Sequence, residues 1–480
     1  MKKTKIVCTM GPNLNDENIM RSLIKNGMDV ARFNFSHGDY EEHKHRMDLL
    51  KRIREEEHKP IAMLLDTKGP EIRTGVLKDG KKVMLQEGKE FILTSDDIIG
   101  DDSRVSITYK GLTADVVPGK RILIDDGLIE LEVKAIENND IICKIQNGGE
   151  LGERKGINVP NVPVRLPAIT EKDKEDIKFG VEQGVDFIAA SFVRNAECIL
   201  EIRSWLSECG APHVPIIAKI ENAEGIRNID EIIRCADGIM VARGDMGVEI
   251  PAQEVPYIQK EIIKKCNDNF KSVITATQML DSMMRNPRPT RAEVTDVANA
   301  VYDGTDAVML SGETAQGKYP VEALKMMVQI VENTESHLDY DVMLSKARKH
   351  RTKGISSAIG YSTVATADNV MAKCIITPTM SGATAKVVSK FKPKCCVLGV
   401  SPDESTLRRM QIYWGVYPMK SIPLKSMEDV CTNALEMVKA KQYVETGDVV
   451  VLTAGLPSTM GAYSHSSNGR SNMMRIAVIE

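Results

Sequence analysis

The sequence has no marked excess of charge of either sign. Its 480 residues include 63 Lys and Arg against 67 Asp and Glu, and the isoelectric point is about 6.2. Proteins that bind nucleic acid through a charged surface carry a strong basic footprint, which this composition does not have. We therefore expect no nucleic-acid partner.

Cysteine is present in modest number and without the spacing of a metal site. None of the ten cysteines belongs to a C-x-x-C pair, and they do not form the dense framework of a small disulfide-rich protein. Cys395 and Cys396 are adjacent in the apolar run "CCVLGV", where we interpret them as buried thiols. A reducing compartment is expected.

Long apolar runs are also missing. No window approaches the ~18 uninterrupted apolar residues of a transmembrane helix. The apolar run after the first lysines is too short for a signal peptide. With 42% hydrophobic and 27% charged residues, the composition is that of a soluble globular protein with several domains. We expect a cytoplasmic protein with no membrane partner.

What the chain does contain is a regular alternation of short apolar runs and helix-length amphipathic stretches. The runs recur roughly every 30 residues, the length of one strand plus one helix, which predicts parallel strands with right-handed crossovers. Eight predicted strands favour an α/β fold of the (β/α)₈ TIM barrel type. An open doubly wound sheet is less favoured, since no dinucleotide fingerprint follows the first strand. The predicted strands are residues 5–10, 30–36, 61–67, 187–193, 216–221, 238–245, 272–278 and 307–313.

Several of these strands share a lead-in of glycine, one residue of any type, and aspartate. The segments are "NGMDV", "QGVDF" and "DGTDA". Glycine suits the position just after the end of a helix. We therefore expect Gly27, Gly184 and Gly304 to end helices, with a strand starting directly afterwards.

One interval breaks the rhythm, between the strands that start at residues 61 and 187. It contains alternating and hairpin patterns such as "RILIDDGLIELEVKAI". A small β-barrel domain inserted after the third strand would hang over the active-site face of the barrel as a lid. A second α/β alternation follows the barrel. The predicted domains are residues 1–69 and 167–344 for the barrel, 70–166 for the lid and 345–480 for the C-terminal α/β domain.

Polar and ionisable residues gather where the predicted barrel strands end. Because the carboxyl ends of barrel strands meet at one face, we expect these residues to form one mouth. So many ionisable groups converging on one face are hard to explain by packing alone. They are Arg32, Asn34, Ser36, His37, Asp66, Thr67, Lys68, Glu71, Arg73, Lys219, Glu221, Arg243, Gly244, Asp245, Thr275, Thr277, Gln278, Ser311 and Glu313.

Glu221 and Asp245 end two neighbouring predicted strands. Two inward-facing carboxylates repel each other unless a cation lies between them. Mg²⁺ is commonly held by one or two carboxylates together with waters and substrate oxygens. The alternative is a carboxylate pair neutralised by arginines. No cluster of His and Cys indicates a transition metal.

The segment "RGDMG" (243–247) places two glycines around an aspartate where a strand turns into a helix. Glycine lets the backbone approach a ligand closely, and a helix N-terminus presents N–H groups to an anion. With Lys219, Arg32 and Arg73 nearby, the segment predicts an anionic, phosphorylated substrate.

Asn34, Ser36, Asp66 and Thr67 supply an oxygen-rich group from two neighbouring strands. One carboxylate with neutral oxygens suits a monovalent cation. Ordinary hydrogen bonds at strand ends are the alternative interpretation.

These residues stand within longer segments that resemble the pyruvate kinase family over essentially the whole chain. The segments are long and occur in the family's order. The barrel, the inserted lid and the C-terminal domain also correspond to the family's three domains. The matching segments are "TKIVCTMGP", "ARFNFSHG", "LLDTKGPEIRTG", "KGINVP", "IAKIENAEG", "DGIMVARGDMGVE", "ATQMLDSM", "RPTRAEVTDVANAVYDGTDAVMLSGETAQGKYP" and "GDVVVLTAG".

The resemblance implies that phosphoenolpyruvate and ADP react to give pyruvate and ATP, the last step of glycolysis. It also implies Mg²⁺ (or Mn²⁺) and K⁺ as cofactors, allosteric regulation and a homotetramer. The chain looks like the bacterial type without the additional C-terminal domain of some members. Glu71 stands where K⁺-dependent members carry Glu and K⁺-independent members carry Lys, so K⁺ dependence is expected.

The resemblance assigns roles residue by residue. Glu221 and Asp245 look like the Mg²⁺ ligands, and Asn34, Ser36, Asp66 and Thr67 look like the K⁺ site. The implied catalytic residues are Lys219, Arg32, Arg73 and Thr277. The implied substrate contacts are Arg32, Lys219, Gly244, Asp245 and Thr277. The implied nucleotide contacts are Asn34, His37, Arg73 and Lys155, the last from the lid.

A loop rich in Thr, Ser and Gly in "TPTMSGATAKVV" (377–388) resembles the family's effector loop. Ala383 stands where members activated by a sugar bisphosphate often carry Lys or Arg. Fructose 1,6-bisphosphate, a sugar monophosphate, a nucleotide such as AMP, and no activator are all left open. The expected effector contacts are Thr377, Thr379, Ser381, Gly382, Thr384 and Arg470.

Two other functions compete with the kinase. One is a phosphoenolpyruvate-using lyase, which would need no nucleotide site and leaves Glu71, Arg73 and Lys155 unexplained. The other is a non-catalytic homologue that senses phosphorylated metabolites through its C-terminal domain. Such a homologue would be expected to lose Lys219, Glu221, Asp245 or Thr277, and all are present.

Overall fold

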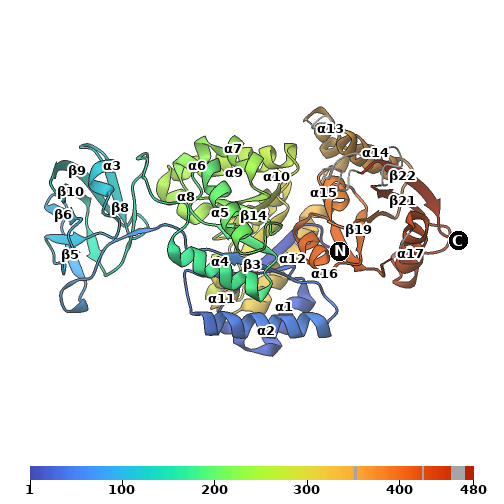
Figure 1. The fold of residues 1–480 in the computed structure, drawn as a ribbon, viewed down its shortest axis with the longest axis horizontal. Coiled ribbons are helices and arrows are strands. Elements are labelled where there is room, and N and C mark those ends of the chain that lie inside the picture. Colours follow the sequence, from blue (N-terminus) through green and yellow to red (C-terminus); the bar gives the residue numbers. More distant parts are fainter. Residues whose placement is uncertain (351–353, 424–425, 456–470) are drawn as a thin grey trace.

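The computed structural model describes residues 1–350, 354–423, 426–455 and 471–480. Three bodies lie in a row, with the inserted lid at one end, the barrel in the middle and the C-terminal α/β domain at the other end (Figure 1). The lid and the C-terminal domain therefore contact opposite sides of the barrel.

The central body is a closed barrel of eight parallel strands, as the sequence predicts. The strands follow the order β1-β17-β16-β15-β14-β13-β3-β2, and β1 closes the barrel by pairing with both β17 and β2. Their apolar residues are almost all fully buried, as expected for strands covered on both faces. The bounds are β1 Lys5–Met10, β2 Val30–Asn34, β3 Ala62–Asp66, β13 Phe187–Ala190, β14 Ile216–Ile220, β15 Gly238–Ala242, β16 Ser272–Ala276 and β17 Ala307–Leu310.

Helices surround this barrel and start at well-defined caps. Thr170 and Thr290 each form a capping box with the residue three positions later, which pairs backbone groups otherwise left without partners. The helices are α1 Glu17–Asn26, α2 Tyr40–Glu56, α4 Glu171–Gln183, α5 Ala196–Glu208, α6 Ala223–Arg227, α7 Ile229–Cys235, α8 Arg243–Glu249, α9 Val255–Asp268, α10 Arg291–Asp303, α11 Gly312–Ala315 and α12 Pro320–Ser336. Short 3₁₀ turns lie at Pro12–Asn15, Ala252–Glu254 and Asp281–Met284.

The glycine of each glycine-x-aspartate segment ends a helix, as the sequence predicts, and the aspartate has a second, separate role. Gly27, Gly184 and Gly304 end α1, α4 and α10 with φ values of 115°, 74° and 92°, which confirms their predicted position. This left-handed backbone is accessible to glycine without steric cost. The aspartate two residues later has a role of its own, which the sequence did not reveal.

Four aspartates at the amino-terminal end of the barrel each hold the start of the preceding strand. Each carboxylate accepts a hydrogen bond from a backbone N–H at 2.7–2.9 Å. Each also pairs with at least one cationic side chain, so these partly or fully buried charges are compensated. The N–H donor and aspartate pairs are Ile6 with Asp29, Met63 with Asp186, Ile216 with Asp237, and Val273 with Asp306. We call these four aspartates the aspartate ring.

The lid is a curled sheet, antiparallel except for the parallel pair of β6 and β7, and it has its own core. Seven strands follow the order β4-β12-β8-β9-β10-β6-β7, and β5 pairs with β11 in a separate ribbon. A single bridge between Thr74 and Ile107 joins the two edges of the seven-stranded sheet, which brings it close to a small barrel. The elements are β4 Ile72–Arg73, β5 Val83–Leu85, β6 Glu90–Thr94, β7 Arg104–Ser106, α3 Leu112–Asp115, β8 Arg121–Ile124, β9 Ile129–Glu137, β10 Asp140–Asn147, β11 Gly149–Leu151 and β12 Gly156–Asn158, with a 3₁₀ turn at Lys78–Gly80.

The C-terminal domain is a five-stranded sheet in the order β20-β19-β18-β21-β22, parallel except for the edge strand β22. α13 crosses the expected boundary at residue 344, and its Leu344 and Ala347 pack on the core of this domain. The elements are α13 Tyr340–His350, α14 Ile355–Asn369, β18 Cys374–Pro378, α15 Ala383–Ser389, β19 Cys396–Ser401, α16 Glu404–Arg409, β20 Val416–Lys420, α17 Met427–Ala440, β21 Val449–Ala454 and β22 Met473–Val478, with a 3₁₀ turn at Met410–Ile412.

The interpretation of Cys395 and Cys396 as buried thiols is wrong. Both side chains are partly exposed, whereas Cys374 on the neighbouring strand β18 is fully buried. The error has a simple cause, because Cys396 begins β19 and Cys395 precedes it, at the end of the sheet rather than in its centre.

The C-terminal domain closes the amino-terminal end of the barrel. Ile412 is only 1% exposed and belongs to the cluster that fills the barrel interior, together with Val7 and Val30. Lys390 and Lys392 both bind Asp306 of the aspartate ring, and Lys392 Nζ lies 2.8 Å from its Oδ1. This end is therefore sealed by apolar contact and by paired charge.

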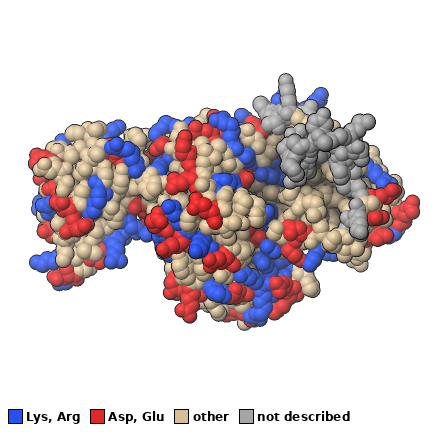
Figure 2. Space-filling model, viewed as in Figure 1, with Lys and Arg blue, Asp and Glu red and all other residues tan. Residues whose placement is uncertain are grey.

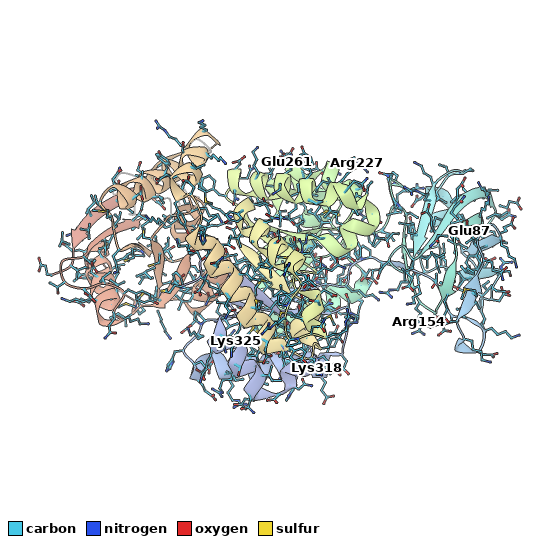
Figure 3. All side chains as sticks on the ribbon, turned by 180° about the vertical axis from the view of Figure 1, so that it is seen from behind. Glu87, Arg154, Arg227, Glu261, Lys318 and Lys325 are labelled. Atoms are coloured by element: carbon cyan, nitrogen blue, oxygen red, sulfur yellow. The ribbon has the colours of Figure 1, made fainter. Side chains whose placement is uncertain are left out.

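The surface carries charge of both signs. On the face seen in Figure 2, Lys and Arg are interspersed with Asp and Glu over the lid, the barrel and the C-terminal domain. Seen from behind in Figure 3, charged residues again project from separate elements, with Glu87 and Arg154 on the lid and Glu261 and Lys325 on the barrel. Within the described ranges, no helix combines the length and the apolar character needed to span a bilayer.

Candidate active site

Three charged side chains meet inside the carboxyl-terminal mouth of the barrel. Arg32 Nε on β2 lies 2.6 Å from Asp66 Oδ2 at the end of β3, and Lys219 Nζ on β14 lies 3.0 Å from Asp66 Oδ1. Asp66 is fully buried, and Arg32 and Lys219 are each 8% exposed. Burial acts to raise the pKa of Asp66, but Arg32 and Lys219 outweigh it and lower that pKa. Asp66 therefore stays ionised and fixes both cations.

Ser191 joins this network and was not identified from the sequence. Its Oγ accepts from Lys219 Nζ at 2.7 Å and donates to the Thr67 carbonyl oxygen at 2.6 Å. It follows β13, the one strand between β3 and β17 for which the sequence suggested no functional residue. A serine directly after an apolar strand is the only signal for it in the sequence.

Glu221 is buried to 1% exposure and lies next to Lys219 on the same face of the strand end. Its Oε1 is 3.0 Å from Lys219 Nζ, and its Oε2 accepts from the backbone N–H of Phe192 at 2.6 Å. Burial raises the pKa of Glu221 to about 7, Lys219 opposes that rise, and the nearby exposed carboxylate of Asp245 adds to it. These contacts do not fully compensate the negative charge of Glu221.

The start of α8 is joined to the end of β16 through Thr277. The Gly244 N–H donates to Thr277 Oγ at 2.7 Å, so it faces a side chain of the same site. Thr277 has φ of 68°, a left-handed conformation that is strained for a β-branched residue. Strain of this kind persists only where the surroundings impose it.

Arg243 holds the backbone on both sides of this position. Its guanidinium donates to the Ala276 carbonyl at 3.2 Å and to the Thr277 carbonyl at 2.7 Å, and it pairs with Asp296 at 2.6 Å. Glu313 similarly accepts backbone N–H bonds from Leu280 and Ser311. Both residues hold the loops of the mouth rather than pointing freely into it.

The predicted monovalent-cation residues lie at the ends of β2 and β3, as expected. Asn34 Oδ1 accepts from the Ser36 N–H at 3.2 Å, and Thr67 Oγ accepts from the Ser191 N–H at 3.1 Å. Asp66 is shared with the cationic network. Within the described residues, no cluster of three or more His, Cys, Asp or Glu could hold a metal by itself. A cation here would need neutral oxygens or substrate oxygens as well.

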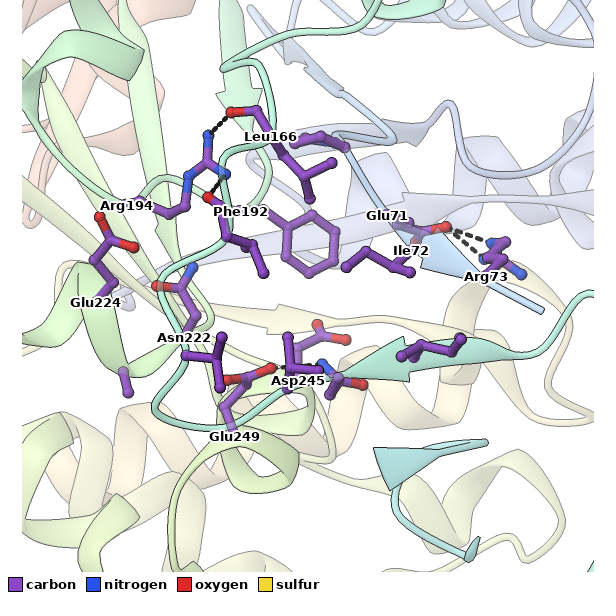
Figure 4. A pocket seen from close by; sticks show the side chains of 18 of the residues that line it. Glu71, Ile72, Arg73, Leu166, Phe192, Arg194, Asn222, Glu224, Asp245 and Glu249 are labelled. Carbon is purple, nitrogen blue, oxygen red and sulfur yellow. Dashed lines mark hydrogen bonds and ion pairs between the residues drawn. The ribbon is translucent and has the colours of Figure 1, made fainter. Parts of the chain in front are cut away.

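A cavity of about 290 Å³ separates the lid from the barrel mouth. Arg73 lines it from the lid, and Asp245 and Glu249 line it from α8 (Figure 4). Lys155 of the lid also lines it. Arg73 pairs with Glu71 at 2.6 Å, and Lys155 pairs with Asp125 at 3.0 Å. Both basic groups thus belong to an interdomain cleft large enough for a ligand. The other two expected nucleotide contacts, Asn34 and His37, are not among the residues that line this cavity, and His37 is exposed.

Comparison with known proteins gives one consistent result. Residues 1–324 match the model of the pyruvate kinase barrel domain, and residues 357–477 match that of the pyruvate kinase alpha/beta domain. The chain belongs to the pyruvate kinase family. It is therefore a phosphotransferase built on a TIM barrel with a C-terminal α/β domain.

Individual relatives agree along the full length. A pyruvate kinase from Clostridium acetobutylicum is 49% identical over 481 residues, with all of both chains covered. A pyruvate kinase from Geobacillus stearothermophilus is 50% identical, and the match covers all of this chain and 80% of that one. The crystal structure of a pyruvate kinase from Cryptosporidium parvum superimposes with a TM-score of 0.94 at 39% identity, covering 100% of this chain and 96% of that one.

The loop that resembles the pyruvate kinase effector loop connects β18 to α15. Thr379 Oγ accepts from the Gly382 N–H at 3.0 Å, and Ser471 Oγ lies 3.0 Å from Thr384 Oγ. Ser381 is exposed in this loop. Thr377 is buried in the sheet and donates to the Leu398 carbonyl, so its hydroxyl serves the sheet. Arg470 lies outside the described residues.

Proposed function

We propose that this chain transfers the phosphoryl group of phosphoenolpyruvate to ADP at the mouth of the barrel, beneath the lid. The products are pyruvate and ATP. The observation that carries the proposal is the buried network of Arg32, Asp66, Lys219 and Glu221 beside Asp245 in a member of the pyruvate kinase family. Arg32 and Lys219, both fixed by Asp66, would bind a phosphorylated anion there.

Lys219 is the proposed catalytic cation. Burial acts to lower the pKa of Lys219, but Asp66 and Glu221 raise it, so the ammonium group stays charged. Phosphoryl transfer needs positioning and neutralisation of the charge on the moving group. Its departure from phosphoenolpyruvate leaves an enolate, and the same ammonium group would stabilise that charge. Arg32, held by Asp66, would bind the phosphate from the other side.

Glu221 and Asp245 are the proposed residues for Mg²⁺ or Mn²⁺. The chemistry of Glu221 fits this role, because burial and the nearby Asp245 raise its pKa and a divalent cation would offset both effects. A bound cation would neutralise charge on the phosphoryl group and on the enolate oxygen. The remaining ligands would be water and substrate oxygens.

Asn34, Ser36, Asp66 and Thr67 are the proposed residues for K⁺. Their donor set of one carboxylate and neutral oxygens fits a weakly held monovalent cation. Glu71 pairs with Arg73 in the cleft, so the Glu71 carboxylate lies beside a proposed nucleotide contact. The expectation that activity depends on K⁺ comes from the resemblance at Glu71, because K⁺-dependent family members carry Glu there.

Thr277 is proposed to take part in the protonation of the enolate at carbon, the step that gives pyruvate. Its hydroxyl donates to the Ala276 carbonyl at 2.7 Å, and a threonine hydroxyl alone is a poor acid. A water ordered by Thr277 is the proposed donor, and the Gly244 N–H that binds Thr277 keeps the hydroxyl oriented.

Arg73 and Lys155 in the cleft, together with Asn34 at the end of β2 and His37 after it, are the proposed contacts of the nucleotide. The cleft between lid and barrel supports this role, since closing it would bring Lys155 toward the barrel and exclude water from the transfer. Asn158 Nδ2 of the lid already donates to Glu249 Oε1 at 2.9 Å, which links the two walls.

The test is a coupled assay of pyruvate formation from phosphoenolpyruvate and ADP with Mg²⁺, with and without K⁺. ATP and pyruvate in equal amounts are expected, with much slower turnover when K⁺ is omitted. No pyruvate at saturating cations would contradict the proposed reaction. Equal rates with and without K⁺ would contradict only the role given to Glu71.

The same assay addresses regulation. We propose that the loop containing Thr379, Ser381 and Gly382, with Thr384, receives a phosphorylated effector, whose identity the Ala383 position leaves open. Fructose 1,6-bisphosphate, a sugar monophosphate and AMP would be compared, and unchanged kinetics with all three would contradict the effector site. A homotetramer is the proposed assembly, to be measured by sedimentation.

A further inference from the structure

A pair of thiols lies in the C-terminal domain, far from the barrel mouth. Cys374 on β18 and Cys396 on β19 are register partners in neighbouring parallel strands. Such strands lie about 4.8 Å apart, within the range of Cα separations that a disulfide bridges. Both side chains belong to the same apolar cluster, on the face of the sheet covered by α17. The two sulfurs therefore point to one side of the sheet.

The two thiols differ in accessibility. Cys374 is fully buried, whereas Cys396 at the start of β19 is partly exposed. A reversible redox site needs one accessible thiol that an oxidant can reach and one adjacent thiol that resolves the oxidised product. Cys396 and Cys374 fit these two roles in that order.

The electrostatics of the pair support the same assignment. The interaction between the adjacent Cys374 and Cys396 thiols lowers the pKa of Cys396 and raises that of Cys374. Burial opposes the lowering at Cys396, and the nearby ammonium groups of Lys3 and Lys373 favour it. The thiolate, which is the reactive form, is thus favoured on Cys396, the residue of the pair that is partly exposed.

We infer that Cys374 and Cys396 form a dithiol redox site that hydrogen peroxide oxidises to a disulfide and that a dithiol reductant returns to two thiols. The Cys396 thiolate attacks a peroxide oxygen, which forms an S–O bond, breaks the O–O bond and releases one water after protonation. The Cys374 sulfur then attacks the Cys396 sulfur and gives up its proton. The S–S bond forms, the S–O bond breaks and a second water leaves. The sulfurs lose two electrons and the peroxide gains them.

The site adjoins the junction with the barrel. Tyr417 packs on the same apolar cluster as Cys396, and its hydroxyl donates to the Lys2 carbonyl at 2.6 Å. Lys3 Nζ donates to the Lys394 carbonyl at 2.6 Å, two residues before Cys396. Cross-linking β18 to β19 would therefore alter the strand ends on which the N-terminal segment rests.

Cys395 provides a matched control. It neighbours Cys396 in sequence and is also partly exposed, but its side chain packs in the cluster on the opposite face of the sheet. A reaction governed by exposure alone would involve Cys395 as readily as Cys396. A reaction governed by geometry would exclude it.

The test is oxidation of the full chain with hydrogen peroxide, followed by alkylation, proteolysis and mass spectrometry, without and with dithiothreitol. We expect loss of two free thiols per chain, a peptide cross-linked through Cys374 and Cys396, and recovery of both thiols on reduction. Cys396→Ser and Cys374→Ser should each abolish the cross-link, and Cys395→Ser should retain it. The wild-type measurement stands even if a variant does not fold.

A cross-link through Cys395 or Cys431, or oxidation of Cys396 to sulfinic acid without a cross-link, would overturn the inference.

Discussion

Both ends of the barrel contain buried charged side chains, but the two ends differ in how these charges are compensated. At the amino-terminal end, Asp306 accepts the Val273 N–H and binds Lys390 and Lys392 of the C-terminal domain. At the mouth, Glu221 has one ammonium partner and one backbone N–H, with Asp245 nearby. The buried charges at the amino-terminal end are therefore compensated within the protein. At the mouth, part of the negative charge is left uncompensated, and an added cation could neutralise it.

The two groups of carboxylates differ in whether they precede or follow a barrel strand. Each member of the aspartate ring immediately precedes a strand and holds the start of the strand before it, so it is part of the scaffold. The mouth residues follow their strands, where loops replace regular pairing and substrate can enter. Buried ion pairs alone do not indicate function, whereas incomplete compensation in an accessible mouth does.

Asp66→Asn is expected to produce the largest combined effect, because Asp66 holds both Arg32 and Lys219. Removing its charge leaves two buried cations with less compensation and frees both from their positions. We expect turnover to fall by on the order of 10²–10³-fold and unfolding free energy to fall by about 3–5 kcal/mol. Steady-state kinetics and urea titration measure the two. Wild-type turnover in this variant would contradict the positioning role of Asp66.

Asp306→Asn tests the other end. Lys390 and Lys392 would lose their anionic partner at the junction, so unfolding free energy should fall by about 3–5 kcal/mol. Because this cluster lies at the opposite end from the mouth, turnover per folded molecule should stay within about twofold of wild type. A loss of turnover comparable to that of Asp66→Asn would break the distinction between the two ends.

Arg243→Lys tests whether the mouth depends on an imposed backbone conformation. Lysine retains a positive charge for Asp296, but its single nitrogen replaces the three guanidinium nitrogens that separately contact Ala276, Thr277 and Asp296. Thr277 should relax from its left-handed conformation, and turnover should fall by about 10²-fold. The matched variant is Lys265→Arg. Lys265 of α9 pairs with Asp230 of α7 at the surface, so this variant should leave the kinetics unchanged. Unchanged kinetics in Arg243→Lys would show that Thr277 is held by other contacts.

Lys392→Met gives the smallest effect, and one that depends on pH. Burial lowers the pKa of Lys392 to about 8, with Asp306 opposing the shift and Lys390 adding to it. Between pH 8 and the ordinary value of 10.5, the unfolded chain holds this proton and the folded chain does not. Folding stability contributed by Lys392 therefore rises with pH across this window and is constant below it.

Relative to Lys392→Met, the wild-type protein should gain about 1–3 kcal/mol of unfolding free energy between pH 7.5 and 10. Urea titrations of both proteins at the two pH values measure this difference. Parallel pH dependence in the two proteins would mean that Lys392 keeps its proton throughout, paired with Asp306.

Much of the fold follows from local sequence patterns. The eight barrel strands, the inserted lid and the second sheet correspond to apolar runs whose length and spacing are set by βα geometry. The ends of these strands indicated Lys219, Glu221 and Asp66 as residues of one mouth. Distances among them could not be predicted, because register between strands distant in sequence depends on tertiary packing.

Three features had no usable signal in the sequence. Ser191 is a single hydroxyl after an apolar run, and its role depends on the positions of Lys219 and Thr67. The aspartate of each Gly-x-Asp segment accepts a hydrogen bond from a backbone N–H at the start of another strand, which is distant in sequence. The pairing of Cys374 with Cys396 depends on strand register, and Cys396 was expected to be buried.

The central claim is that Lys219 acts on the reacting groups rather than serving as a structural partner of Glu221. The measurement is kcat and KM for phosphoenolpyruvate in Lys219→Met, with the folded fraction checked by thermal unfolding. A loss of about 10²–10³-fold in kcat, with KM within a few-fold of wild type, is the predicted result. Wild-type turnover in a folded Lys219→Met protein would contradict the account and reduce the pair to a structural ion pair.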